Sequence, residues 1–348
     1  MSFFRYLVLL SLLPGVVRAQ DRSRRDVDTS GKKFVTPATQ RAINKGLRWL
    51  AAEQSTSGSF GSSGGYSDNV GVTSLAGLAF VASGSTPDRG RYGRQVSLAV
   101  DYVISRMQPN GYILSPRSSQ SNGPMYGHGF ATLFLCEIYG MIERDGLRPK
   151  LSKAVQLIVT SQNDEGGWRY SPRSRDADIS VTVCMMMALR AAKNAGFAVP
   201  RETVDKCVLY LRKCQNTDGG FRYQLESERV SGFSRSAAAV VGLNTAGIYS
   251  GDEIKSALGY LELFRPGGNS RVRQYYYYGH YYASQAMWQA GGDHWFDWYP
   301  VVRDELLKNQ QTEGSWRDVG PRIGSTYATA MALLVLQTPN NLLPIFQR

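Results

Sequence analysis

One short phrase recurs along this 348-residue chain at nearly constant intervals. "QNDEGGWRY" begins at Gln162, and "QNTDGGFRY" begins 53 residues later at Gln215. Related phrases begin at Gln54, Gln108 and Gln310, so the successive steps are 54, 54, 53 and 95 residues. A fixed period is typical of repeat architectures. Because the last step is close to two units, the sequence predicts six repeats, of which one lacks the phrase.

Each phrase separates two stretches of different character. The stretch before it carries Leu, Val, Ile or Trp at three- and four-residue spacing, which predicts a helix with one solvated face. The stretch after it is apolar, rich in small residues and poor in charge, which predicts a buried helix. The repeat without the phrase shows the same pair, "GDEIKSALGYLELF" and "HYYASQAMWQAGG", joined through "RPGGN". Since a closed ring buries all six apolar helices, we predict an all-α fold, an α6/α6 toroid formed as a single domain by residues 36–348.

Within this fold the phrase has a structural role. Glycine supplies the left-handed backbone that ends a helix, and glutamine can bond backbone groups left open there. The Trp or Phe that follows can pack into the seam between repeats. We therefore expect each phrase to end an outer helix and seal it to the next repeat.

The phrase also indicates a family. Gln, three residues, Gly, one residue and then Trp or Phe resembles the QW-type repeat of squalene and hopene cyclases. The six-pair architecture is similar to the α6/α6 toroid that these enzymes share with protein prenyltransferase β subunits and complement thioester domains. Four repeats carry the full pattern, and the resemblance covers about residues 36–348: Gln54/Gly58/Phe60, Gln162/Gly166/Trp168, Gln215/Gly219/Phe221 and Gln310/Gly314/Trp316.

The resemblance implies catalytic residues that this chain keeps only in part. Class II terpene cyclases use an Asp-x-Asp-Asp motif as the acid. Here Asp176 and Asp178 stand where its first two carboxylates would, and Ile179 replaces the third.

The resemblance to protein prenyltransferases implies a zinc site that this chain lacks. Those enzymes hold zinc through Asp, Cys and His, and the equivalent positions here are Tyr282, Ser284 and Tyr327. We therefore expect no metal and no cofactor. The Cys-Gly-Glu-Gln stretch of complement-type thioesters is not found in the sequence.

Two further patterns mark candidate binding residues. The six buried helices can be aligned on one Ser or Thr in each. Four residues before that position, three of the helices carry His128, Asp178 and His280, which the ring would place in one tier near a mouth. We expect His128 and Asp178 to form a hydrogen-bonded pair; the alternative is that these are polar helix starts that satisfy open backbone donors. "QYYYYGHYYASQAMW" adds Tyr278, Tyr281 and Tyr282 beside His280. These rings either line a cavity for an apolar or cationic ligand or replace the missing Trp packing of repeat five.

Four cysteines are expected to be buried free thiols. Cys207 and Cys214 lie seven residues apart on a predicted helix, about 10 Å along its axis, which is too far for a disulfide. Cys136 and Cys184 lie in apolar runs.

The N-terminal region predicts export. Residues 1–19 combine a short basic start, the apolar run "YLVLLSLLPGVV" and small residues before a cleavage point after Ala19, as a signal peptide does. An uncleaved anchor is the alternative, although Pro14 and Gly15 interrupt the run. Residues 20–35 form a basic linker.

Residues 1–33 hold seven Lys/Arg and three Asp, so they contribute +4 of the +12 net charge and leave +8. We interpret this surplus as solvated charge with a membrane surface as a possible partner, and we expect no nucleic acid.

These observations favour an exported toroid that binds an apolar small molecule or a protein partner in its cavity or on its rim. The alternative is an isoprenoid enzyme that uses Asp176 and Asp178 in an aromatic-lined cavity. A third class, polysaccharide cleavage, needs paired carboxylates across a groove, and the sequence places Asp164/Glu165 and Glu226/Glu228 in turns or loops.

Overall fold

The computed structural model describes residues 31, 33–61, 66–117, 123–268, 272, 274–318 and 323–347. Over this part of the chain twelve long helices form and no strand does. The outer helices are α2 (Pro37–Ala52), α4 (Gly93–Ser105), α6 (Leu147–Thr160), α8 (Arg201–Cys214), α10 (Asp252–Glu262) and α12 (Gly292–Asn309). The inner helices are α3 (Val70–Ala82), α5 (Pro124–Ile138), α7 (Ile179–Asn194), α9 (Phe233–Thr245), α11 (Tyr276–Ala290) and α13 (Ser325–Gln337).

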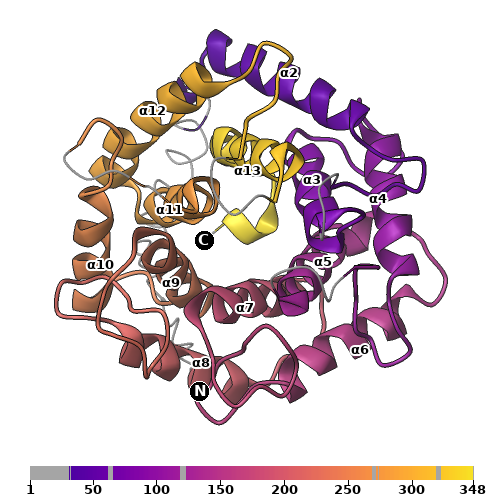
Figure 1. Cartoon of the computed structure of the whole chain (residues 1–348). Coiled ribbons are helices and arrows are strands. Elements are labelled where there is room, and N and C mark those ends of the chain that lie inside the picture. The colour runs from indigo at the N-terminus through magenta and orange to yellow at the C-terminus, as the bar shows by residue number, and fades with distance from the viewer. Residues whose placement is uncertain are drawn as a thin grey trace, which may run out of the picture.

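The helices form two concentric rings (Figure 1). Each inner helix packs against the next one, and α13 packs against α3 to close the inner ring. Outer helix α2 packs against both α12 and α13, so the first and last repeats meet. The predicted α6/α6 toroid is confirmed, with outer and inner helices alternating along the chain as expected.

The two rings differ as their compositions predict. All thirteen residues of α3 are buried, whereas α8 buries six of its fourteen residues. Inner helices touch neighbours on every side, so an apolar surface all round is buried, while an outer helix needs an apolar stripe on one side only. None of the described helices is long and apolar enough to cross a membrane. All four cysteines are free and buried, as predicted.

The glutamine of each of the four full phrases ties its own turn to the next outer helix. Nε2 of Gln162 donates to the carbonyl oxygen of Gly166 at 2.8 Å and to that of Thr203 on α8 at 2.9 Å. Gln54, Gln215 and Gln310 make the same two bonds, and the bond from Gln310 to Ala42 of α2 closes the ring. The phrase therefore seals neighbouring repeats, as predicted.

The glycine of the phrase permits this close approach. Gly166 has φ +92°, and a Cβ there would lie 2.4 Å from the carbonyl oxygen of Lys206 on α8. Gly219 has φ +84°, and its Cβ would lie 2.3 Å from the carbonyl oxygen of Ser256 on α10. Any larger residue would push the next outer helix away.

The aromatic position of the phrase is bonded to the inner helix that follows. The backbone N–H of Trp168 donates to Oγ1 of Thr182 at 3.0 Å. Phe60, Phe221 and Trp316 donate in the same way to Thr73, Ser236 and Thr329. Outer helix, phrase and inner helix are thus one hydrogen-bonded unit.

The C-terminal segment covers one end of the inner ring. The 3-10 helices η4 (Thr338–Asn340) and η5 (Pro344–Phe346) contact α11 and α7 respectively. The backbone N–H of Ile345 donates to Glu137 at 3.2 Å, and the Phe346 ring lies 6.4 Å from that of Tyr281. In Figure 1 this yellow segment lies towards the centre of the ring. The toroid is therefore closed at the end where the inner helices finish.

Candidate functional site

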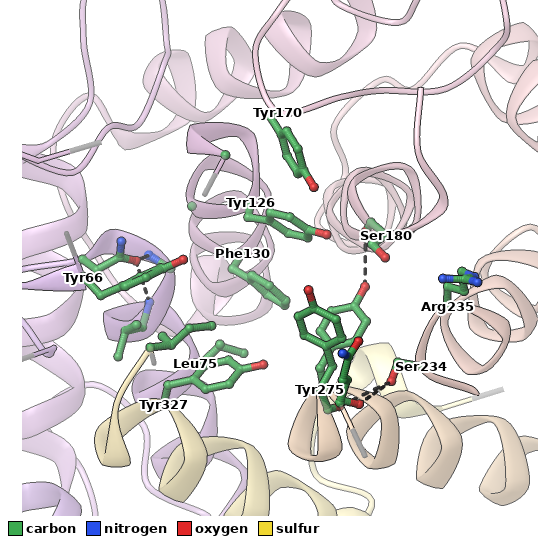
Figure 2. Close-up of a pocket in the computed structure, with 18 of the residues that line it drawn as sticks. Tyr66, Leu75, Tyr126, Phe130, Tyr170, Ser180, Ser234, Arg235, Tyr275 and Tyr327 are labelled. Atoms are coloured by element: carbon green, nitrogen blue, oxygen red, sulfur yellow. Dashed lines mark hydrogen bonds between the residues drawn. The ribbon is translucent and has the colours of Figure 1, made fainter. Parts of the chain in front are cut away.

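A cavity of about 780 Å³ lies at the opposite end, where the six inner helices begin. We call it the cup, and it is lined by residues from the first two turns of all six inner helices and by the loops before them. Seven tyrosines face it, together with Phe130, Phe233 and Phe264: Tyr66, Tyr126, Tyr170, Tyr223, Tyr275, Tyr278 and Tyr327. Figure 2 shows the rings of Tyr66, Tyr126, Phe130 and Tyr327 directed towards one common space.

The helical register explains much of this lining. Tyr126, Tyr278 and Tyr327 are each the third residue of their inner helix, and Val72 and Arg235 are the third residues of α3 and α9. All five line the cup. Equivalent positions on helices arranged in a ring face the same axis, so this register builds one belt of side chains.

The cup is well supplied with hydrogen-bond donors. Burial raises the pKa of the Tyr126 and Tyr278 hydroxyls well above the ordinary value of 10.0, so both stay protonated at neutral pH. Ser180 and Asn69 add polar atoms to the lining. The surroundings suit a ligand that is mainly apolar and carries a few polar atoms.

The last residue of the two matching phrases reaches the cup. The hydroxyls of Tyr170 and Tyr223 lie 2.5 Å apart, although the residues are 53 positions apart in the chain. The Arg169 guanidinium lies over both rings, 4.6 Å from the Tyr170 centroid and 5.4 Å from the Tyr223 centroid. The phrase is therefore not structural alone, because its final tyrosine forms part of the cavity wall.

Asp178 lies behind this wall as the N-cap of α7. It is fully buried, and Oδ1 accepts the backbone N–H of Val181 at 2.9 Å while Oδ2 lies 3.4 Å from Nη1 of Arg169. Burial raises the pKa of Asp178 to about 6, although the Val181 N–H and the Arg169 charge lower it. Asp176 is different: its carboxylate is 55% exposed and accepts from Nε2 of Gln224 at 2.8 Å. Neither carboxylate is among the described residues that line the cup.

Of the five residues predicted to bind a ligand, the structure places Tyr278 on the cup wall. Tyr281 and Tyr282 are buried deeper, with ring centroids 4.9 Å apart, in the packed interior of the ring. His280 is also buried, among the rings of Phe233, Tyr276 and Trp298, and its nitrogens have no hydrogen-bond partner among the described residues. The tyrosine run of repeat five therefore does both things considered for it: part lines a cavity and part packs.

The expected pair of His128 and Asp178 is wrong. Nδ1 of His128 accepts the backbone N–H of Ile113 at 3.2 Å, and Nε2 lies 3.2 Å from the carbonyl oxygen of Ala154. His128 thus takes the place that Thr182 and its equivalents have in other repeats, one turn deeper than the N-cap Asp178. Burial lowers its pKa to about 4, so it is a neutral structural residue. Aligning the helices on Thr132 shifted this repeat by one turn.

Sequence reasoning missed most of the cup. Tyr66, Tyr126, Tyr170, Tyr223 and Arg235 were not singled out. The signal that was available lies in two positions: the tyrosine ending both matching phrases, and the third residue of each inner helix. The described residues contain no group of three His, Cys, Asp or Glu able to hold a metal ion.

Comparisons with known proteins agree with this architecture. The family model of the prenyltransferase alpha-alpha toroid domain matches residues 31–262. No curated protein sequence matches the chain.

Several solved structures share the fold. A variant of the type II terpene cyclase MstE from Scytonema, in complex with its substrate geranylgeranyl dihydroxybenzoate, is 14% identical with a TM-score of 0.62, and the match covers 88% of this chain and 98% of that one. An inactive variant of an alpha-1,6-mannanase from Salegentibacter, in complex with alpha-1,6-mannotriose, is 8% identical with a TM-score of 0.65, covering 87% and 99%. A cellobiose 2-epimerase from Bacillus thermoamylovorans is 11% identical with a TM-score of 0.62, covering 90% and 100%. At these identities the likeness shows the fold alone.

Proposed function

This chain belongs to the prenyltransferase alpha-alpha toroid domain family, and we propose that it binds one small, largely apolar molecule in the cup. The observation that carries the proposal is the wall itself: seven tyrosines and three phenylalanines from all around the ring enclose about 780 Å³. Pockets of this size and composition suit ligands of a few hundred daltons. Aromatic rings supply apolar area at little cost in side-chain entropy, and the tyrosine hydroxyls orient the polar atoms of a ligand.

The ligands of the structural neighbours support a small molecule in this place. One neighbour is described with a geranylgeranyl-substituted dihydroxybenzoate and another with a mannotriose. For this chain we favour the first kind of chemistry. The described part of the cup wall holds no carboxylate, whereas cleavage of a glycoside uses two carboxyl groups that flank the bond.

Native mass spectrometry of the gently purified protein tests the proposal first. We expect a copurified adduct of a few hundred daltons. A titration with the neutral fluorophore N-phenyl-1-naphthylamine should then saturate at one site per chain. Ser180→Trp, which places an indole on the cup wall, should abolish probe binding, while Tyr139→Ala at the far end of α5 should leave it unchanged. If the probe does not bind, the proposal is wrong. If only a second polypeptide copurifies, the occupant is a protein partner and the proposal is also wrong.

The burial of Asp178 favours a second candidate function, an isoprenoid enzyme. Protonating an alkene needs a carboxyl that keeps its proton, and a pKa of about 6 moves Asp178 in that direction. Its charge also affects the pKa of Tyr126, Tyr223 and Tyr278, so it lies close to the cup. Tyrosine rings around the cup can stabilise a carbocation. Against this role, one carboxylate oxygen caps α7 and the other faces Arg169.

Product analysis separates the two functions. The wild-type protein would be incubated with squalene or with a geranylgeranyl-substituted phenol, and the extract searched for cyclised products. An enzyme should lose its product on Asp178→Asn while still binding the fluorophore, because asparagine caps a helix as well as aspartate does. Absence of product from the wild-type protein under conditions where it binds the substrate rejects the enzyme.

We also infer export and removal of residues 1–19, which lie outside the described residues. The buried thiols are compatible with an oxidising destination, since burial raises the pKa of Cys214 to about 11 and keeps it as an unreactive thiol. N-terminal sequencing of protein from the exported fraction should begin at Gln20. A chain that keeps its N-terminus and stays with the cells contradicts the inference.

A further inference from the structure

We infer that the ligand of the cup carries one anionic group, a carboxylate or a phosphate, which Arg235 holds where α9 begins. The inference rests on the proposed function, because it assigns chemistry to one end of the same ligand.

Arg235 is the charged side chain among the described residues that line the cup. It stands at the third position of α9, which is occupied by Tyr126, Tyr278 and Tyr327 on three other inner helices. An aromatic ring at that position serves an apolar ligand, whereas a guanidinium there brings a permanent positive charge to the wall of an apolar cavity.

The backbone holds Arg235 in place without neutralising it. Nε donates to the carbonyl oxygen of Phe221 at 3.0 Å, and Nη2 donates to that of Val230 at 2.7 Å. These bonds use part of the five-donor fork, and no bond from Nη1 is formed to the described residues. The guanidinium is therefore positioned in advance, which lowers the entropy cost of binding an anion.

Arg169, the other arginine near the cup, shows what a neutralised guanidinium is like. Its Nη1 lies 3.4 Å from Asp178, and its Nε lies 3.4 Å from Asp176. Arg235 has no carboxylate within 4.0 Å among the described residues. Burial lowers the pKa of Arg235 from its ordinary value, which reflects a charge that has lost water and gained no counter-ion. A bound anion would supply that counter-ion.

The start of α9 adds to the same positive potential. Its N-cap is Gly232, which makes no side-chain cap, and the four residues from Gly232 to Arg235 all line the cup. The first backbone N–H groups of a helix have no partner within the helix and carry the positive end of its dipole. A carboxylate or phosphate beside Arg235 can accept from these groups as well as from the guanidinium.

Matched ligands with the same alkyl chain test this inference. Dodecanol, dodecanoate and dodecyl phosphate would be titrated against N-phenyl-1-naphthylamine bound to the full-length protein at pH 7.5 and moderate salt. A charge-assisted hydrogen bond should make at least one anion roughly tenfold to a hundredfold tighter than dodecanol. The anion that gains more distinguishes a carboxylate from a phosphate as the natural group.

Two variants attribute the preference to Arg235. Arg235→Gln should remove the preference, so that the anions bind this variant no more tightly than dodecanol does. Gly232→Asp should do the same by placing a carboxylate at the N-cap, as Asp178 does on α7, and its Cβ would need only the flexible Arg235 side chain to move. The matched control is Arg222→Gln, in the same loop but outside the described cup wall, and it should keep the preference.

The outcomes separate this inference from the function on which it rests. If the wild-type protein binds all three ligands alike, or if Arg235→Gln and Gly232→Asp keep the preference for an anion, the inference is wrong while the cup remains a binding site. If neither the probe nor any of the three ligands binds, the proposed function fails and this inference fails with it.

Discussion

Repeats three and four, whose phrases begin at Gln162 and Gln215, carry almost the same phrase and yet contribute different chemistry to the cup. In both, the glutamine bridges two carbonyls and the glycine meets the next outer helix. They differ ten or eleven residues after the aromatic position. Repeat three has Asp178 as the cap of α7, facing Arg169, whereas repeat four has Gly232 before α9, with Arg235 unpaired among the described residues.

The comparison separates the residues that build the ring from those that set its chemistry. The phrase determines how one repeat joins the next, and its requirements are the same in the four repeats that carry it in full, because their junctions make the same hydrogen bonds. The helix cap lies in the cup wall at Gly232 and behind it at Asp178, so each cap meets different neighbours. A carboxylate at one cap neutralises its arginine, and a glycine at the other leaves room for an outside anion.

The largest expected effect tests whether the junctions formed by the phrases of repeats three and four are equivalent. Gly166→Ala and Gly219→Ala combine a positive φ with a Cβ 2.4 Å and 2.3 Å from a carbonyl oxygen, so each should lower the free energy of unfolding by roughly 3–5 kcal/mol. Gly196→Ala is the control, because it has φ +80° with nothing within 4 Å and should cost only about 1 kcal/mol. Urea denaturation gives the values. Equal losses at Gly166 and Gly196 would show that the junction relaxes.

The next effect exposes the difference between the caps. The folded chain holds the pKa of Asp178 at about 6, above its ordinary value of 3.8, so the folded state binds the proton more tightly than the unfolded state. Stability from this group is present below pH 4 and is lost as the pH rises towards 6. Relative to wild type, Asp178→Asn should therefore gain roughly 3 kcal/mol between pH 4 and pH 7.

Denaturation at several pH values measures this gain, with Asp176→Asn as the control for removing a largely exposed carboxylate. A difference between Asp178→Asn and wild type that does not change with pH would mean that the Arg169 charge offsets the burial of Asp178.

A smaller effect concerns the glutamine bridges. Gln162→Ala and Gln215→Ala each remove two hydrogen bonds to backbone carbonyls and should each cost about 1–2 kcal/mol. The values should be equal, because the third bond of Gln215, from Nε2 to Oγ of Ser256 at 3.3 Å, is exposed and adds little. Gln156→Ala, on the exposed face of α6, should change the stability by less than about 0.5 kcal/mol. Unequal losses at Gln162 and Gln215 would contradict the equivalence of the junctions.

The smallest effect lies where the two repeats touch. A double-mutant cycle of Tyr170→Phe and Tyr223→Phe should give a coupling of about 0.5–1 kcal/mol, since the two hydroxyls lie 2.5 Å apart. Pairing Tyr170→Phe with Tyr139→Phe, at the far end of α5, should give none. A zero coupling for the first pair would mean that each hydroxyl bonds water equally well.

Much of the fold is readable because it is local. The spacing of apolar residues distinguishes outer from inner helices, and Gln162, Gly166 and Trp168 mark each junction at a fixed distance from a helix end. The register of the inner helices is less readable, because the aromatic position and its acceptor are separated by 13 residues in Phe60–Thr73 and by 15 in Ile113–His128. In the second repeat the acceptor is His128, and Thr132 follows one turn later, so an alignment on Ser or Thr places His128 one turn too near the mouth of the ring.

By itself, the sequence determined the six-fold repetition, the toroid and the role of its recurring phrase, because each depends on residues close together in the chain. Only the tertiary structure decided which side chains share the cup. Tyr66 and Tyr327 come from opposite ends of the chain and meet because the ring closes. What packs beside Arg169 and Arg235 decides that the first faces carboxylates and the second does not. A cavity formed at the axis of a closed ring depends on every repeat at once, so no local pattern specifies it.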